Sequence, residues 1–565
     1  MNIRKILTIC LVGVSLCSCN DLLTEVPEDF LSPENSYTDK EGMEAAVNFL
    51  YLDIRSQFYA PTYDSWKPYT MLGVDVDLWC QQYDNDKYNS YFYWNTANAD
   101  MDNAKMWWSN CYGTIFKCNV IINRSQNPDI RWSEEEKNLC IAEAKFVRAF
   151  YYRLLGNMWG TAPLVVEEEE PRFNYTNSTP EAIFKQCKED LEFAITYLPD
   201  VDKQIGGKAS KQAAHHLMSE VCLSMKDYQG AVEHASQVIN HPGMELMKDR
   251  FGKYVDFEFE GWDYQGEKQP WGDVYFDLFR EGNFNRVEGN KECIWNIQMD
   301  PYIEGGGHVG KQVYCSFERW LTTCYTATTK DGKMSFMQDV LGGRAAGANS
   351  PTPYAADYIW EFKGDFDRDI RNSTYNVQRE WYITNPESEY YGQIFTPENI
   401  GLMSWYFRVT QPGFKKFVPV KHYGFGWDVV SQCAHDGGYV YKDWYIMRLA
   451  ETYLLRAEAY MNLNKKTEAA ADINTVRLRA HATPIDPSEV NIDLILDERA
   501  RELYGEEFRL NTLMRLNKLA EYVMKYNPLA KKEGWKLPDY LNKFPIPNSE
   551  IEANKEGGLV QNPGY

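Results

Sequence analysis

Beyond its N-terminal segment, the sequence has no apolar run long enough to cross a bilayer as a helix, which takes about 20 residues. Basic residues are also scarce, because 59 Lys and Arg stand against 81 Asp and Glu, for a formal net charge of -22. An acidic surface repels nucleic acid and anionic lipid, unless a local basic pocket overrides it. These features argue against a nucleic-acid-binding protein and, more weakly, against a strongly anionic polymer as ligand.

The motifs of several enzyme classes are absent as well. There is no G-x-S-x-G elbow, no H-E-x-x-H motif and no P-loop. A glycoside hydrolase needs two carboxylates about 5–10 Å apart, but among 81 acidic residues such pairs arise by chance. His215, His216 and Glu220 share one predicted helix, where packing or solvent exposure is expected rather than metal binding. The sequence favours a non-catalytic binding protein with no metal and no cofactor.

Cysteine is scattered along the chain and does not form a recognisable site. The 13 Cys include no C-x-x-C motif and no Cys/His cluster with zinc spacing. One or two disulfides are compatible with the sequence, but a disulfide framework is not expected to hold a chain of 565 residues together. Several Cys fall in predicted helices, where a free Cys acts as a small buried hydrophobe. These are Cys118, Cys140, Cys187 and Cys222.

The first residues have the pattern of a bacterial lipoprotein signal. A basic start is followed by an apolar stretch over residues 6–14 and by Leu16-Cys17-Ser18-Cys19, which resembles a lipobox. We expect residues 1–18 to be removed and Cys19 to be lipidated; an ordinary secretory signal is the alternative. Several acyl chains would anchor the protein durably. Residues 19–40, with scattered Pro and acidic residues, are expected to form a tether.

Residues 446–481 predict two amphipathic helices joined by a short polar turn. Apolar residues recur at steps of three and four, so each helix has one buried face, and small Ala residues allow close approach. Residues 210–239 repeat this hairpin, since the interval from Glu220 to Ala231 equals that from Glu458 to Ala469. Repeats of this tetratricopeptide type need stacked neighbours to bury their faces.

The remaining pattern divides one large domain, residues 41–565, into regular and irregular parts. Helical periodicity covers about 41–57, 104–240 and 446–526. In 58–103 and 241–445, Gly, Asn, Asp and aromatic residues dominate, and periodicity fades. We therefore predict a mostly α fold of tetratricopeptide-like hairpins that carries a large, irregular, ligand-facing half with short strands.

Three local patterns predict particular contacts. Ser133 followed by Glu136 predicts a capping box at a helix start. Alternating Asp and Arg over residues 365–371 predict an internal salt-bridge network rather than a polar clamp for a ligand. A series of apolar residues at steps of four predicts a core-facing helical stripe rather than a binding surface. This series is Trp108, Tyr112, Phe116 and Val120.

Five landmarks follow one another along the chain. They are Cys19 with its tether; AEAKFVRAFYY at 142–152 with Gly160 and Pro163-Leu164 after it; RLAETYLLRAEA at 448–459; DERAREL at 497–503 with EEFR at 506–509; and FPIP at 544–547 with Glu550-Ile551 and the final QNPGY. Together they resemble the SusD/RagB family of outer-membrane nutrient-binding lipoproteins from Bacteroidetes.

The resemblance implies a fold, a place and a partner. It implies a helical body at the outer face of the outer membrane and a SusC-like TonB-dependent transporter beneath it. In such pairs the lipoprotein sits over the barrel as a lid, captures an oligosaccharide and delivers it. Because some members resemble oligopeptide-uptake components, a peptide cargo is an alternative; a pure scaffold and a surface glycoside hydrolase are others.

Aromatic residues are abundant at 15%, including 17 Trp and 39 Tyr, so some are expected on a recognition surface. Sugars present flat C–H faces ringed by hydroxyls, which aromatic faces and polar side chains match. The family's site uses aromatics from the loop after the first helix and from the irregular insertion. The alternative for each candidate is burial under the loops. The candidate glycan-binding residues are Trp79, Tyr83, Tyr91, Trp94, Trp271 and Trp320.

Overall fold

The computed structural model describes most of the chain after the tether. Besides a few isolated residues, it describes residues 37–59, 70–71, 73–79, 94–170, 172–259, 268–300, 327–335, 349–401, 411–420, 427–428, 433–434 and 442–565. Within these ranges the protein is mostly helical, with several short strands, which confirms the predicted fold class. No helix among them is long and apolar enough to span a bilayer.

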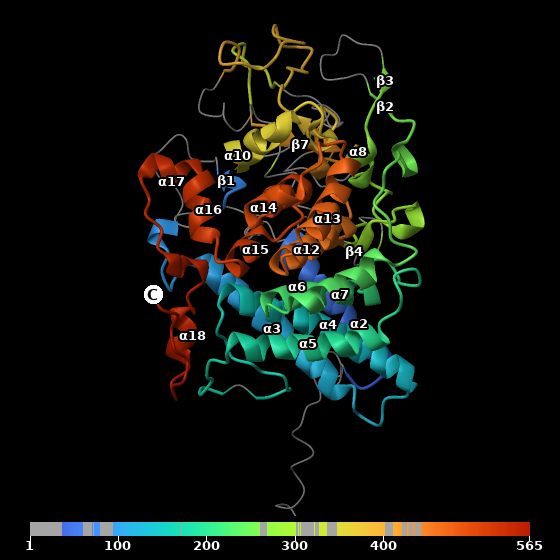
Figure 1. Ribbon diagram of the computed structural model, residues 1–565, viewed down its shortest axis with the longest axis vertical. Coiled ribbons are helices and arrows are strands. Elements are labelled where there is room, and N and C mark those ends of the chain that lie inside the picture. The colour runs from blue at the N-terminus through green and yellow to red at the C-terminus, as the bar shows by residue number, and fades with distance from the viewer. Residues whose placement is uncertain are drawn as a thin grey trace, which may run out of the picture.

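A first group of helices forms the lower part of the view in Figure 1. Its centre is α4, which packs on α3 and α5 and is almost entirely buried beyond Cys140. The predicted capping box starts it, because the Ser133 amide donates to Glu136 (2.8 Å) and the Glu136 amide donates to Ser133 Oγ (3.2 Å). The helices are α2 (Lys40–Ile54), α3 (Asp102–Arg124), α4 (Glu134–Met158), α5 (Pro180–Tyr197), α6 (Lys211–Ser224) and α7 (Tyr228–Ile239).

The second group comes from the C-terminal part of the chain. The two sequence repeats stack on each other, because α12 packs on α13 and also on α6 and α7. This arrangement buries the Ala-rich faces of both hairpins. The helices are α12 (Leu449–Asn462), α13 (Lys466–Arg479), α14 (Ile492–Leu503), α15 (Arg509–Arg515), α16 (Leu519–Tyr526), α17 (Pro528–Glu533) and α18 (Asn548–Ala553).

Two boundaries differ from the sequence prediction. The hairpin helix starts at Leu449, because Trp444–Arg448 forms strand β10 against β4 (Cys293–Ile297). The helical periodicity predicted to run to residue 526 is interrupted after α15, because Asn517 adopts the left-handed conformation (φ 54°) and ends that helix. The first difference arises from strand pairing and the second from the backbone conformation of one residue. The spacing of apolar residues predicts neither.

The strands are short and occur as separate antiparallel pairs in the irregular half, which occupies the upper part of Figure 1. Besides β4 with β10, they are β1 (Asp77–Trp79) with β5 (Asn349–Pro351), β2 (Glu258–Phe259) with β3 (Gln269–Pro270), β6 (Val377–Gln378) with β7 (Gly413–Phe414), and β8 (Trp427–Asp428) with β9 (Cys433–Ala434). Two short helices, α8 (Val274–Leu278) and α10 (Pro353–Ala356), and several 3-10 turns lie among them.

One hydrophobic core runs through both halves. Trp295 of strand β4 packs edge-on against Phe146 and Phe150 of α4, with ring centroids 5.1 and 5.7 Å apart. The predicted small-hydrophobe role of cysteine is confirmed, because the described free cysteines are all buried. These are Cys111, Cys118, Cys140, Cys187, Cys222 and Cys293.

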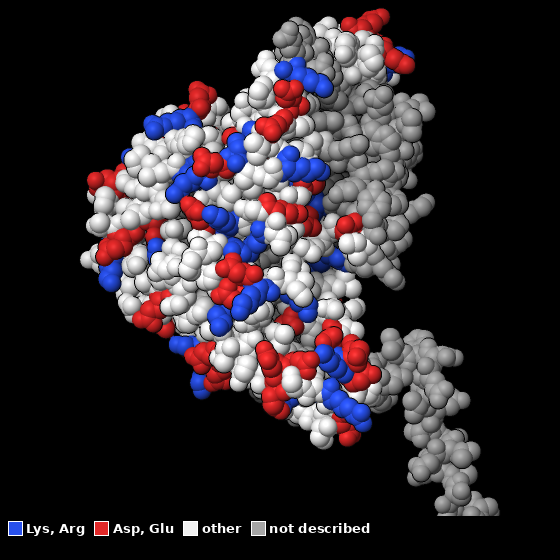
Figure 2. Space-filling view, turned by 90° about the vertical axis from the view of Figure 1, so that its right-hand side faces the viewer, with Lys and Arg blue, Asp and Glu red and all other residues white. Residues whose placement is uncertain are grey.

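The net negative charge is spread out rather than concentrated on the face seen in Figure 2. There, acidic and basic side chains alternate over the helical part, without a large patch of one sign. Interspersed charges of this kind favour solubility more than the recognition of a charged polymer.

Candidate functional site

A buried network of Arg and Glu residues joins the irregular half to the helical hairpins. Arg448, at the end of β10, lies 2.9 Å from Glu292, which precedes β4, and 2.7 Å from Glu502 of α14. Arg479 of α13 contacts the same two glutamates. Arg371 contacts Glu502 (3.0 Å) and Glu498 (2.7 Å). All these side chains are at most 1% exposed.

The charges in this network stabilise one another. Burial by itself raises the pKa of the Glu502 carboxyl, but Arg479, Arg448 and Arg371 outweigh burial and hold that pKa far below its usual range. The balance is similar at Glu498, where burial is outweighed mainly by Arg371 and the pKa falls to about 2. The glutamates therefore stay ionised inside the protein.

The segment 365–371 belongs to this network. Asp365 lies 2.8 Å from Arg477 of α13, and Asp369 lies 2.6 Å from Arg371. The sequence prediction of an internal salt-bridge network is thus confirmed. The consequence for the site is rigidity, because the turns that carry the loops are fixed to α13 and α14 by charge-assisted hydrogen bonds.

The segment before β1 is hydrogen-bonded to residues of the C-terminal helical region. Arg509 of α15 donates to Asp75 (2.5 Å), and Asn527 donates to the Val74 carbonyl (3.2 Å). Strand β1 then pairs with β5, so that Trp79 is opposite Asn349. These contacts place the main chain of Trp79 at the edge of the irregular half.

Trp94 lies inside the core. It is 5% exposed, stacks on Phe544 with ring centroids 6.2 Å apart, and donates its indole N–H to the Gly73 carbonyl (2.9 Å). These contacts match the alternative of burial under the loops. Trp94 supports the segment that leads to β1.

Trp271 directly follows β3 and is half-buried in a small aromatic cluster. Its ring meets Phe259 and Tyr375 edge-on, at centroid distances of 5.1 and 5.0 Å, and the Lys415 ammonium lies 4.8 Å from the ring centroid. The indole N–H is buried and has no hydrogen-bond partner among the described residues. Because this N–H has almost no solvent-accessible surface, the part of Trp271 that a ligand can reach is the exposed part of its ring.

The other predicted contacts lie outside the described residues. This applies to Tyr83, Tyr91, Trp320 and the lipidation residue Cys19. Of the two predicted aromatics whose side chains the structure describes, Trp94 lies in the core and Trp271 lies in the irregular half.

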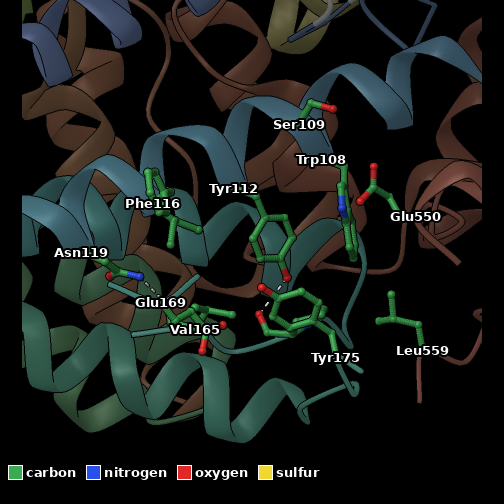
Figure 3. Close-up of a pocket in the computed structure, with 12 residues that line it drawn as sticks. Trp108, Ser109, Tyr112, Phe116, Asn119, Val165, Glu169, Tyr175, Glu550 and Leu559 are labelled. Carbon is green, nitrogen blue, oxygen red and sulfur yellow. Dashed lines mark hydrogen bonds between the residues drawn. The ribbon is translucent and has the colours of Figure 1, made fainter. Parts of the chain in front are cut away.

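A pocket that the sequence does not predict lies on the outer face of α3. It has a volume of about 280 Å³ and lies between α3, the segment after α4 and the region of α18. Figure 3 shows Trp108, Tyr112 and Phe116 along one side, Val165 and Tyr175 opposite, and Glu550 and Leu559 at one end. We call it the α3–α18 pocket.

This pocket corrects the prediction that the whole α3 stripe faces the core. Trp108 and Val120 are buried as predicted, but Phe116 is 52% exposed. Steps of four advance about 40° beyond a full helical turn, so the series does not stay on one face of the helix. The core face instead follows mixed steps of three and four, through Ala104, Trp107, Cys111, Ile115 and Cys118.

Asp200, Asp202 and His241 are described residues close enough to share a metal ion, with ligand atoms within 4.8 Å of one another. Each already has a protein partner. His241 Nε2 lies 3.1 Å from Asp200, and Asp202 pairs with Arg286. The set is accounted for as an ion-pair cluster.

His215, His216 and Glu220 take packing roles. His215 contacts His234 (3.0 Å), His216 contacts Thr452 (2.8 Å), and Glu220 pairs with Arg153 (2.6 Å). These contacts agree with the packing role that the sequence analysis gave as one expectation for the two histidines.

Comparison with protein families decides the classification. A model described as "SusD family" matches residues 291–565, and one described as "Starch-binding associating with outer membrane" matches residues 65–223. The chain belongs to the SusD family. The resemblance predicted from the five landmarks is thereby confirmed.

Relatives of this SusD-family chain match it along nearly its whole length. SusD-like protein P25 of Formosa agariphila is 24% identical over 98% of this chain and 97% of that protein. A solved "laminarin binding SusD-like protein" has a TM-score of 0.66 and 23% identity, covering 94% of this chain and all of that chain. Surface glycan-binding protein A of Bacteroides thetaiotaomicron, solved with laminarihexaose, has a TM-score of 0.66 and 19% identity over 93% of this chain and all of that chain.

The SusD-family match covers the residues of the buried Arg and Glu network. The model over 291–565 contains Glu292, Arg371, Arg448, Arg479 and Glu502, so the network belongs to the part of the chain that carries the family pattern. Tyr83 and Tyr91 fall within residues 65–223, which the second model matches.

Proposed function

We propose that this chain is a cell-surface glycan-binding lipoprotein that captures oligosaccharides and delivers them to a SusC-like TonB-dependent transporter, for which it acts as a lid. The observation that carries the proposal is Trp271, a half-buried aromatic ring in the irregular half. Aromatic rings match the C–H faces of sugars. Solved proteins of this fold that bind laminarin and laminarihexaose support a glucan as the cargo.

The proposed contacts are Trp271 together with Trp79, Tyr83, Tyr91 and Trp320; Trp94 acts from inside by supporting the segment before β1. If two or three rings each contribute about 1 kcal/mol beyond hydroxyl hydrogen bonds, the affinity is roughly micromolar to millimolar. Such an affinity suits a protein that releases its cargo to a transporter.

We assign this chain binding without catalysis. The test is electrophoresis of the mature chain through gels that contain laminarin or starch, beside an assay for new reducing ends. Retarded migration without new reducing ends is expected. New reducing ends would support the hydrolase alternative, and a protein that ignores both glucans yet retains peptides in a pull-down would support peptide uptake.

The proposed location depends on Cys19. Substitution of Cys19→Ala is expected to abolish lipid labelling and to release the protein from the outer membrane, because the anchoring acyl chains are lost. Co-purification of the wild-type chain with a TonB-dependent barrel from detergent-solubilised outer membranes tests the partner. Lipid labelling that persists in the variant would overturn the choice of Cys19.

A further inference from the structure

The α3–α18 pocket holds polar groups that the fold leaves unused. The Trp108 indole N–H, the Ser109 and Tyr175 hydroxyls and the Glu550 carboxylate make no hydrogen bond or ion pair with any described residue. The neighbouring polar groups, in contrast, are occupied. Tyr112 donates to the Pro163 carbonyl (2.7 Å), and Asn119 donates to the Val165 carbonyl (3.0 Å). The pocket therefore offers both free donors and free acceptors.

Aromatic rings form the walls around these groups. Trp108 and Tyr112 lie side by side along α3, with ring centroids 4.9 Å apart, and Phe116 continues the row at the open end. The Arg172 guanidinium lies 4.6 Å from the ring centroid of Tyr175 and pairs with Glu169 (3.2 Å), which orders the opposite wall. Rings of this kind present flat apolar faces at a solvent-accessible site.

This chemistry selects among possible occupants. An acyl chain or an apolar side chain would leave the four free polar groups unpaired, which is costly once water is excluded. An anion would approach Glu550 and Glu169 unfavourably, and a simple cation would leave the indole N–H and hydroxyl donors unused. A sugar ring satisfies rings, donors and acceptors together. A volume of about 280 Å³ suits one sugar unit rather than a long chain.

We propose that the α3–α18 pocket is a second carbohydrate site that holds one sugar unit of a glycan. In Figure 1, α3 and α18 lie towards the lower left, whereas β3, which leads to Trp271, lies at the upper right, so the two sites are far apart on the molecule. This inference rests on the proposed glycan-binding function. Two separate sites on one chain retain a polymer more strongly than either site alone, because the second contact is made at high effective concentration.

The test compares variants of the full mature chain in gels containing laminarin or starch. The triple substitution Phe116→Ala, Tyr175→Ala and Glu550→Ala removes one ring from each side of the pocket and one acceptor. Phe49→Ala is the matched control, because Phe49 is an equally exposed ring (48%, against 52% for Phe116) on α2, outside the pocket. We expect the triple variant to lose at least about fivefold in polymer affinity and the control to match wild type. Circular dichroism and Tm verify the fold of both variants.

The possible outcomes separate the two proposals. A triple variant that migrates like wild type, while Trp271→Ala loses retention, overturns the second site and leaves the glycan-binding function standing. If neither laminarin nor starch retards the wild-type chain, both the glycan-binding function and the second site are overturned. Glu550→Gln keeps a hydrogen-bonding side chain and should retain most of the affinity. If it weakens retention as strongly as Glu550→Ala does, Glu550 does not act as an acceptor for a sugar hydroxyl, and the proposal is overturned.

Discussion

Arg448 donates a hydrogen bond of 2.7 Å to Glu502, and neither side chain is more than 1% exposed. The first residue ends a strand of the irregular half and the second lies on helix α14. Their contact therefore joins the irregular half of the protein to its helical part. Because the same glutamate also receives Arg479 and Arg371, it is the point where the network converges.

Glu502→Gln should destabilise the protein severely. The substitution leaves Arg448, Arg479 and Arg371 buried with less compensating charge, and breaking a buried pair in this way costs about 3–5 kcal/mol. Urea unfolding followed by circular dichroism measures the loss. The matched control is Glu489→Gln, whose partner Lys363 lies 2.8 Å away in a pair exposed by 26% and 33%; it should cost less than about 1 kcal/mol. Equal losses would contradict the structural role of the network.

The same carboxylates predict how stability depends on pH. The pKa of Glu498 is about 2 in the folded protein, below its unfolded value of about 4.3. A carboxyl with a depressed folded pKa binds fewer protons in the folded state, so its contribution is fully present above pH about 4.3 and is lost as the pH falls towards 2. The urea midpoint should therefore fall steeply over this window. Glu498→Gln should lower the midpoint at pH 7 and flatten the slope; an unchanged slope would contradict this assignment.

Two aromatic residues should respond differently to substitution. Trp271→Ala should reduce glucan retention about tenfold or more with a modest change in Tm, because it removes a ring from the proposed site. Trp271→Phe keeps a smaller aromatic ring, so its loss should be intermediate.

Trp94→Ala should act on stability instead. It removes a large core side chain that stacks on Phe544, at a cost of about 3–5 kcal/mol. Urea unfolding is the measurement, and retention is compared in the folded fraction. A fully stable Trp94→Ala variant that fails to bind glucan would show that this ring contacts the ligand.

Two helical glycines form a matched pair for testing the packing. A Cβ at Gly156 of α4 would lie 2.7 Å from the Phe184 ring of α5, whereas a Cβ at Gly113 of α3 would have nothing within 4 Å. Gly156→Ala should therefore destabilise the protein by about 1–3 kcal/mol through overpacking. Gly113→Ala should stabilise it by up to about 1 kcal/mol through helix propensity. Thermal unfolding measures both, and shifts of the same sign would contradict the close contact of α4 with α5.

Local patterns predicted the local structure well. Ser133 and Glu136 form the expected capping box, because its partners stand only three residues apart. The hairpin repeats were recognisable because helical periodicity is a property of neighbouring residues. The site was harder to predict from the sequence, because Trp94 and Trp271 have the same side chain. Only their surroundings make Trp94 a core residue and Trp271 a half-buried one.

The sequence by itself determined the class of this protein. Periodicity required stacked helical hairpins, the lipobox-like start predicted an anchor, and ordered motifs identified the SusD family. Tertiary structure decided which surfaces are available. It placed Phe116 beside Tyr175 and Glu550, turned residues 444–448 into a strand, and brought Arg371, Arg448 and Arg479 to one glutamate. These outcomes depend on contacts between segments distant in sequence, whereas periodicity and motifs record only what neighbouring residues share.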